Sequence, residues 1–92
     1  MQLHVITGSR KTGKTKRLRA VQAELKSQGI NASIVTGNAC TTPYLVDQIK
    51  RSAESGACHF LADDCTREQI KAVQRQEPNL SDDITVYLVR QA

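Results

Sequence analysis

The sequence contains few aromatic residues and few prolines. It has one Phe, two Tyr, no Trp and two Pro among 92 residues. Hydrophobic residues still make up 39 % of the chain, so a core must be built from Leu, Ile, Val and Ala. This composition is typical of a folded domain and excludes a disordered chain. The scarcity of aromatic rings also disfavours a surface that stacks on single-stranded bases.

The cysteines and the lengths of the hydrophobic runs argue against further classes of protein. Three cysteines, an odd number without C-x-x-C spacing, disfavour a secreted disulfide framework and favour a reduced cytoplasmic setting. No apolar run approaches the roughly 18 residues of a membrane span. No basic segment followed by an apolar one resembles a signal peptide. We therefore expect a single cytoplasmic domain over residues 1–92, without membrane contact.

The charge is unbalanced towards basic residues. Thirteen Lys and Arg against nine Asp and Glu give a formal net charge of +4. This charge is compatible with an anionic ligand, such as a nucleotide or a nucleic acid, but specifies neither. Six of the ten residues from 10 to 19 are Lys or Arg. Those on the helix predicted after Lys14 can contact a nucleic-acid backbone, but a solvated helix face is the favoured interpretation.

Strand-like and helix-like segments alternate along the chain. Apolar runs predict strands at 3–7, 32–36, 57–62 and 84–89. Helical patterns lie between them, from Lys14 to Gly29, from Thr42 to Gly56 and over about 66–76. This βαβαβαβ order predicts an α/β fold with a four-stranded parallel sheet between helices.

Local signals mark two helix starts and the position of the last strand. Thr42 and Pro43 fit an N-cap followed by proline at the first helical position. Thr66 with Gln69 fits a capping box. The apolar run at 84–89 suits an interior strand, which favours the strand order 1-4-3-2 over 2-3-1-4, although both remain open.

A glycine-rich loop follows the first predicted strand. Residues 8–15, GSRKTGKT, match the pattern G-x-x-x-x-G-K-[ST] at every fixed position. Such a loop brings backbone N–H groups close to a phosphate chain, and the following helix adds its positive end. The lysine reaches the terminal phosphates, and the threonine hydroxyl is placed to bind Mg²⁺. The candidate phosphate-binding residues are Gly8, Ser9, Arg10, Lys11, Thr12, Gly13, Lys14 and Thr15.

This loop resembles the Walker A motif of the P-loop NTPase superfamily. The resemblance covers eight residues and the strand–helix order, and it points to no narrower family. It implies a minimal P-loop nucleotide-binding domain, a three-layer α/β/α sandwich, that holds ATP or GTP with Mg²⁺. It also implies a catalytic role for Lys14.

Two carboxylates follow the third predicted strand. Phe60-Leu61-Ala62-Asp63-Asp64 resembles a Walker B motif, which implies Asp63 as a second Mg²⁺ ligand and Asp64 as the residue that activates water. Many ATPases of the superfamily have a Glu at the second position, and Asp is one methylene shorter. The competing interpretation is a turn that leads into the third helix.

Several features of larger P-loop enzymes are absent from the sequence. It has no Asn-Lys-x-Asp stretch, which disfavours a GTPase, and no arginine-rich lid insertion, which disfavours a nucleotide kinase. A partner or a second copy would then supply the arginine that stabilises transition-state charge. Candidates on this chain are Arg51, Arg67 and Arg75.

Two functional hypotheses follow. The first is an ATP-binding protein with weak Mg²⁺-dependent hydrolysis. The alternative is a non-catalytic module that binds nucleic acid or protein through the basic loop and first helix. Phosphoryl transfer to a small acceptor is a third and weaker hypothesis.

Overall fold

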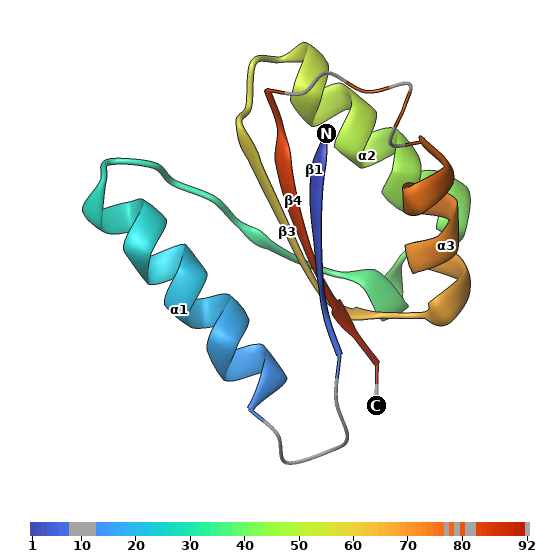
Figure 1. Cartoon of the computed structure of the whole chain (residues 1–92), viewed down its shortest axis with the longest axis horizontal. Helices are drawn as coiled ribbons and strands as arrows, with labels where there is room; N and C mark the ends of the chain where they lie inside the picture. Colours follow the sequence, from blue (N-terminus) through green and yellow to red (C-terminus); the bar gives the residue numbers. More distant parts are fainter. Residues whose placement is uncertain (8–12, 77, 79, 81–82, 92) are drawn as a thin grey trace.

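The computed structural model describes residues 1–7, 13–76, 78, 80 and 83–91. Strands and helices alternate along the chain (Figure 1). They are β1 (Gln2–Ile6), α1 (Lys14–Ser27), β2 (Ile34–Thr36), α2 (Thr42–Glu54), β3 (His59–Cys65), α3 (Arg67–Gln76) and β4 (Thr85–Arg90). A short 3₁₀ turn, η1 (Gly37–Ala39), connects β2 to α2. The predicted α/β alternation is confirmed.

All four strands are parallel and follow the order β1-β4-β3-β2. The structure thus confirms the favoured order 1-4-3-2 and excludes 2-3-1-4. β4 lies between β1 and β3, and its Val86, Leu88 and Val89 are at most 2 % exposed. A strand that is covered on both faces needs such a continuous apolar run.

The helices cover both faces of the sheet, with α1 on one side and α2 and α3 on the other (Figure 1). On the α1 side, Leu18 and Leu25 pack with Leu61 and Val89. The core of the other side is larger, and its buried residues are Met1, Leu45, Ile49, Phe60, Ala62, Cys65, Ile70, Val73, Ile84, Val86 and Leu88. The two clusters make a three-layer arrangement built from aliphatic side chains.

The start of α2 differs by one residue from the prediction. Thr41, not Thr42, is the N-cap, and its Oγ1 accepts a hydrogen bond from the Tyr44 N–H at 3.2 Å. Pro43 consequently occupies the second helical position. Proline is tolerated there because the N–H groups of a first helical turn have no acceptor within the helix.

The predicted capping box of α3 is present. The Thr66 N–H donates to Gln69 Oε1 at 2.9 Å, and the Gln69 N–H donates to Thr66 Oγ1 at 3.2 Å. Gln69 is only 2 % exposed, and its Nε2 donates to the carbonyls of Gly37 and Cys40 at 2.7 and 2.9 Å. This one side chain therefore caps α3 and fixes the turn that follows β2.

Gly37 allows β3 to lie close to η1. A Cβ at this position would lie 2.8 Å from Cys65 Sγ and 3.0 Å from Cys65 Cα. Those distances are shorter than van der Waals contact, so a side chain here would push β3 and η1 apart.

The predicted end of the third strand is wrong. β3 continues through Asp63 and Asp64 to Cys65, whereas the sequence predicted that the strand ends at residue 62. Pairing with both neighbours holds this segment extended: Asp63 pairs with Thr36 of β2, and Cys65 pairs with Arg90 of β4. The pairing with β4 is irregular between Ala62 and Cys65. The other strands differ from their predicted limits by only one or two residues.

Candidate functional site

Thr15 and Asp63, the two predicted magnesium ligands, lie side by side. The Thr15 Oγ1 donates a hydrogen bond to Asp63 Oδ1 at 3.3 Å. Thr15 lies in the first turn of α1, and Asp63 lies near the carboxyl end of β3, paired with Thr36. In an open parallel sheet, ligands bind beyond the carboxyl ends of the strands. The contact thus brings the two predicted motifs together at that edge.

Gly13, Lys14 and Thr15 are the candidate phosphate-binding residues that the structure describes. Gly13 has a φ of 76°, in the left-handed region where a side chain is strained. Lys14, the first residue of α1, is only 9 % exposed. Thr15 is exposed to solvent. The other candidate phosphate-binding residues lie outside the described part of the chain, and these are Gly8, Ser9, Arg10, Lys11 and Thr12.

Asp64, the predicted water-activating residue, has an unusual backbone. Its φ of 55° is the only positive φ at a non-glycine residue in the part of the chain that the structure describes. Its N–H donates to Asp63 Oδ1 at 2.8 Å, so this oxygen accepts two hydrogen bonds, one from Asp64 and one from Thr15. Non-glycine residues in this region are uncommon and concentrate at functional sites. Asp64 is half-buried, inside β3 rather than in a turn.

The Thr15 and Asp63 oxygens fit the geometry of a magnesium ion. Octahedral Mg²⁺ binds oxygens at 2.0–2.1 Å, so two adjacent ligand oxygens lie about 2.9 Å apart. The observed 3.3 Å between Oγ1 and Oδ1 is close to that spacing. Within the described residues, no group of three or more His, Cys, Asp and Glu side chains is placed to hold a metal. A Mg²⁺ ion with few protein ligands takes the others from water and phosphate.

Cys65 lies directly behind the two carboxylates and is fully buried. Burial, and then the negative charges of Asp63 and Asp64, raise the pKa of its thiol to about 12. Cys65 is therefore a neutral packing residue rather than a nucleophile. The sequence did not predict that Cys65 lies at the site. It also did not predict the contacts of Gln69 with η1. Only the capping-box half of the Gln69 role had a local signal.

In the described part of the chain, none of the three candidate arginines forms a hydrogen bond or an ion pair with Thr15 or Asp63. Arg51 forms an exposed ion pair with Asp47 on α2, at 2.8 Å and with i,i+4 spacing. Arg67 lines a pocket between α3, β1 and β4. Arg75 is exposed in the last turn of α3.

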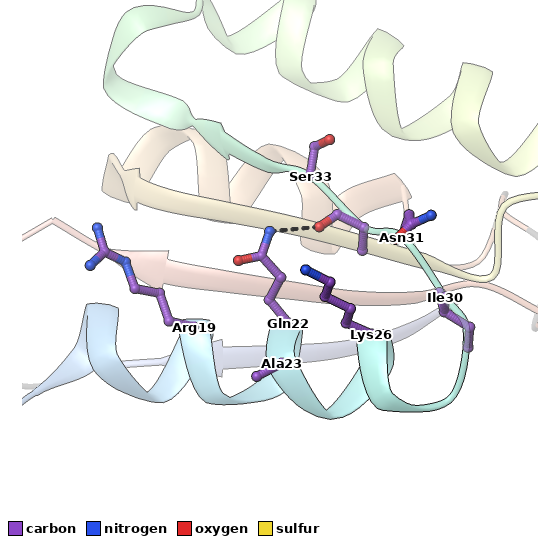
Figure 2. Close-up of a pocket in the computed structure, with 8 residues that line it drawn as sticks. Arg19, Gln22, Ala23, Lys26, Ile30, Asn31 and Ser33 are labelled. Atoms are coloured by element: carbon purple, nitrogen blue, oxygen red, sulfur yellow. Dashed lines mark hydrogen bonds between the residues drawn. The ribbon is translucent and has the colours of Figure 1, made fainter.

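A hollow lies beside α1, and neither Thr15 nor Asp63 lines it. It has a volume of about 360 Å³, and Arg19, Gln22 and Lys26 form its helical wall (Figure 2). The opposite wall is the segment from Ile30 to Ser33, where the Ala32 carbonyl accepts a hydrogen bond from Gln22 Nε2 at 2.8 Å. Of the residues that the structure describes, two cations and no carboxylate line this hollow, so it is compatible with a polyanion along α1.

None of the helices in the described residues is long and apolar enough to cross a membrane. Comparisons with known proteins add no family to these observations. No protein-family model matches the chain, and neither a curated protein nor a solved structure matches it at a significant level.

Proposed function

We propose that this chain binds ATP with Mg²⁺ through the loop at residues 8–15. One observation carries the proposal: the hydrogen bond between Thr15 and Asp63. These residues are 48 positions apart. Each belongs to a different motif, and each motif predicts that its residue binds the same Mg²⁺ ion. A chance match to the loop pattern gives no reason for its threonine to contact the acidic residue of the second motif.

The remaining residues have complementary roles in this proposal. Lys14 and the backbone of the loop bind the phosphates, and the N-terminal end of α1 adds its positive dipole. Thr15 and Asp63 hold Mg²⁺, which when bound neutralises charge on the phosphate oxygens. Base recognition is weak because the described residues around the contact place no aromatic ring there, so the triphosphate dominates affinity.

Replacement of Lys14 tests the proposal directly. We expect Lys14→Ala to abolish binding of Mg·ATP measured by calorimetry, because the phosphates then lack the positive charge of the lysine. The matched control is Lys16→Ala, an exposed lysine two positions along the same helix, which changes net charge equally. Full ATP affinity in a folded Lys14→Ala chain would refute the proposal. A parallel titration with Mg·GTP measures selectivity between the two nucleotides.

Hydrolysis is a separate and weaker part of the proposal. Asp64 is the candidate for orienting the attacking water, and a partner or second copy would complete the site with an arginine. If Asp64 has this role, Asp64→Asn lowers the rate of phosphate release and leaves the Mg·ATP dissociation constant unchanged. Transfer to an acceptor other than water would appear as ATP consumption without release of phosphate.

A nucleic-acid-binding module is the alternative function. It is favoured by the exposed Lys16, Arg17 and Arg19 on α1, and by the cationic hollow at Arg19 and Lys26 (Figure 2). Binding to backbone phosphates weakens steeply with salt. Titration with a DNA or RNA oligonucleotide at several salt concentrations, with and without ATP, separates this function from nucleotide binding alone. Absence of salt-dependent binding would eliminate it.

A further inference from the structure

A second cationic pocket lies at the carboxyl edge of the sheet, on the face opposite α1. We call it the α3 pocket; its volume is about 200 Å³. Val5 and Ile70 form its apolar floor, and Thr7, Arg67, Lys71 and Arg90 contribute its polar walls. It shares no residue with the Thr15–Asp63 contact.

The charges around the α3 pocket are of one sign. Arg67 and Lys71 lie one turn apart on α3, and Arg90 ends β4 on the other side of the pocket. Among the described residues, no Asp or Glu lines it, and no carboxylate forms an ion pair with any of these three cations. The described part of the fold therefore brings three positive charges together without a carboxylate beside them.

This arrangement opposes the stability of the unliganded helix. Like charges at i,i+4 repel one another and destabilise a helix. Arg67 is also the first residue of α3, and the positive end of the helix dipole disfavours a cation there. An anion in the pocket would reverse both effects, because it would interact favourably with the three side chains and with the helix end.

We propose that the α3 pocket binds the phosphate group of a small phosphorylated molecule. Two guanidinium groups offer paired N–H donors that match the oxygens of a phosphate, Lys71 adds a point charge, and the Thr7 hydroxyl adds a neutral donor. The apolar floor accommodates the carbon part of such a ligand. None of the residues that line this pocket is assigned to the proposed ATP site, and the proposal does not depend on ATP binding.

The test uses inorganic phosphate as the probe and the full chain carrying Lys14→Ala, in which the loop phosphate site is disabled. Phosphate is expected to shift the backbone amide NMR signals of Thr7, Arg67 and Lys71. Adding Arg90→Gln is expected to weaken phosphate binding at least tenfold. Arg75→Gln is the matched control, because it removes the same charge from an exposed residue of α3 that does not line the pocket.

Several results would overturn the proposal. One is a Lys14→Ala chain that is folded but shows no shifts at these three amides. Another is an equal loss of affinity in the Arg90→Gln and Arg75→Gln chains, which would indicate a general charge effect. A third is an oligonucleotide that occupies the same amides at least tenfold more tightly than phosphate, which would assign the pocket to a polynucleotide.

If Lys14→Ala prevents folding, the same comparison is made in the chain with Lys14 intact. The amides of Thr7, Arg67 and Lys71 should then titrate together, with a dissociation constant that Arg90→Gln raises at least tenfold. Unchanged titration of these amides in Arg90→Gln would refute the site.

Discussion

The hydroxyl of Thr15 contacts the carboxylate of Asp63 at 3.3 Å and thereby joins the first turn of α1 to β3. The two segments belong to different layers, and the contact connects them at the carboxyl edge of the sheet. A metal ion bound here would be sensitive to any change in the spacing of these layers.

Replacement of Asp63 should remove the magnesium dependence of nucleotide binding. Asp63→Asn keeps the size of the side chain but removes its charge, so we expect the affinity for Mg·ATP to fall at least tenfold, or about 1.4 kcal/mol. Affinity in EDTA should change little, because the metal is then absent from both chains. Asp47→Asn on α2 is the control; an equal loss of affinity there would contradict the assigned role.

Two glycines with similar backbone angles allow strain to be separated from function. Gly13 has a φ of 76° and Gly29 has a φ of 81°, at opposite ends of α1. Alanine at either position should lower the free energy of unfolding by about 1 kcal/mol, since both must keep a left-handed conformation. Chemical denaturation measures this effect. Only Gly13→Ala should also weaken ATP binding, and equal ATP affinities in the two variants would argue against a phosphate-binding loop.

Gln69 should be important for stability despite being polar. Gln69→Ala leaves the buried carbonyls of Gly37 and Cys40 without its donor and removes the cap of α3. We expect a loss of about 2–3 kcal/mol in the free energy of unfolding, measured with urea. Gln74→Ala, an exposed position on the same helix, should change it by less than about 0.5 kcal/mol. Similar values for the two variants would show that the observed network contributes little.

The thiol of Cys65 should lower the free energy of unfolding at alkaline pH. Its pKa is about 12 in the folded chain, against 9.0 for a thiol exposed to solvent in the unfolded chain. Between these values the folded state keeps the thiol proton and the unfolded state loses it, so stability falls as pH rises through this window. This single group contributes a slope of up to about 1.4 kcal/mol per pH unit.

The measurement is urea denaturation in EDTA from pH 8 to 10.5, with Cys65→Ala as the comparison. Lysines and tyrosines titrate in both chains, so only the difference between them reports on Cys65. Identical slopes would contradict a buried, neutral thiol. Alkylation should likewise modify exposed Cys58 long before Cys65 in the folded chain.

Local signals were sufficient for much of the fold. The apolar run in β4 predicted its interior position, and Thr66 with Gln69 predicted the start of α3. The motifs identified Thr15 and Asp63 as candidates for one site, and the structure places them in contact. In each case the information lies in neighbouring residues and in the general geometry of parallel sheets.

The errors concern contacts between distant segments. Asp63 and Asp64 have poor strand propensity, so the third strand was predicted to end at residue 62, yet pairing with Thr36 and Arg90 holds the segment in the sheet. Thr41 and Thr42 are the same residue type, so the neighbouring sequence did not determine which of them is the N-cap of α2. No local pattern indicates that Gln69 reaches the carbonyls beyond β2, because that contact depends on how η1 packs against α3.

The position of β4 also has a consequence for how the protein is made. β1 and β3 are not neighbours in the sheet, because β4, which follows both of them in the sequence, lies between them. Until residues 85–90 are inserted, the strand that leads into the loop has no partner, although α1 and β3 have already been synthesised. A chain that lacks this segment therefore contains both predicted motifs but not the strand that connects β1 to β3, so the proposed site should form only after residues 85–90 have been synthesised.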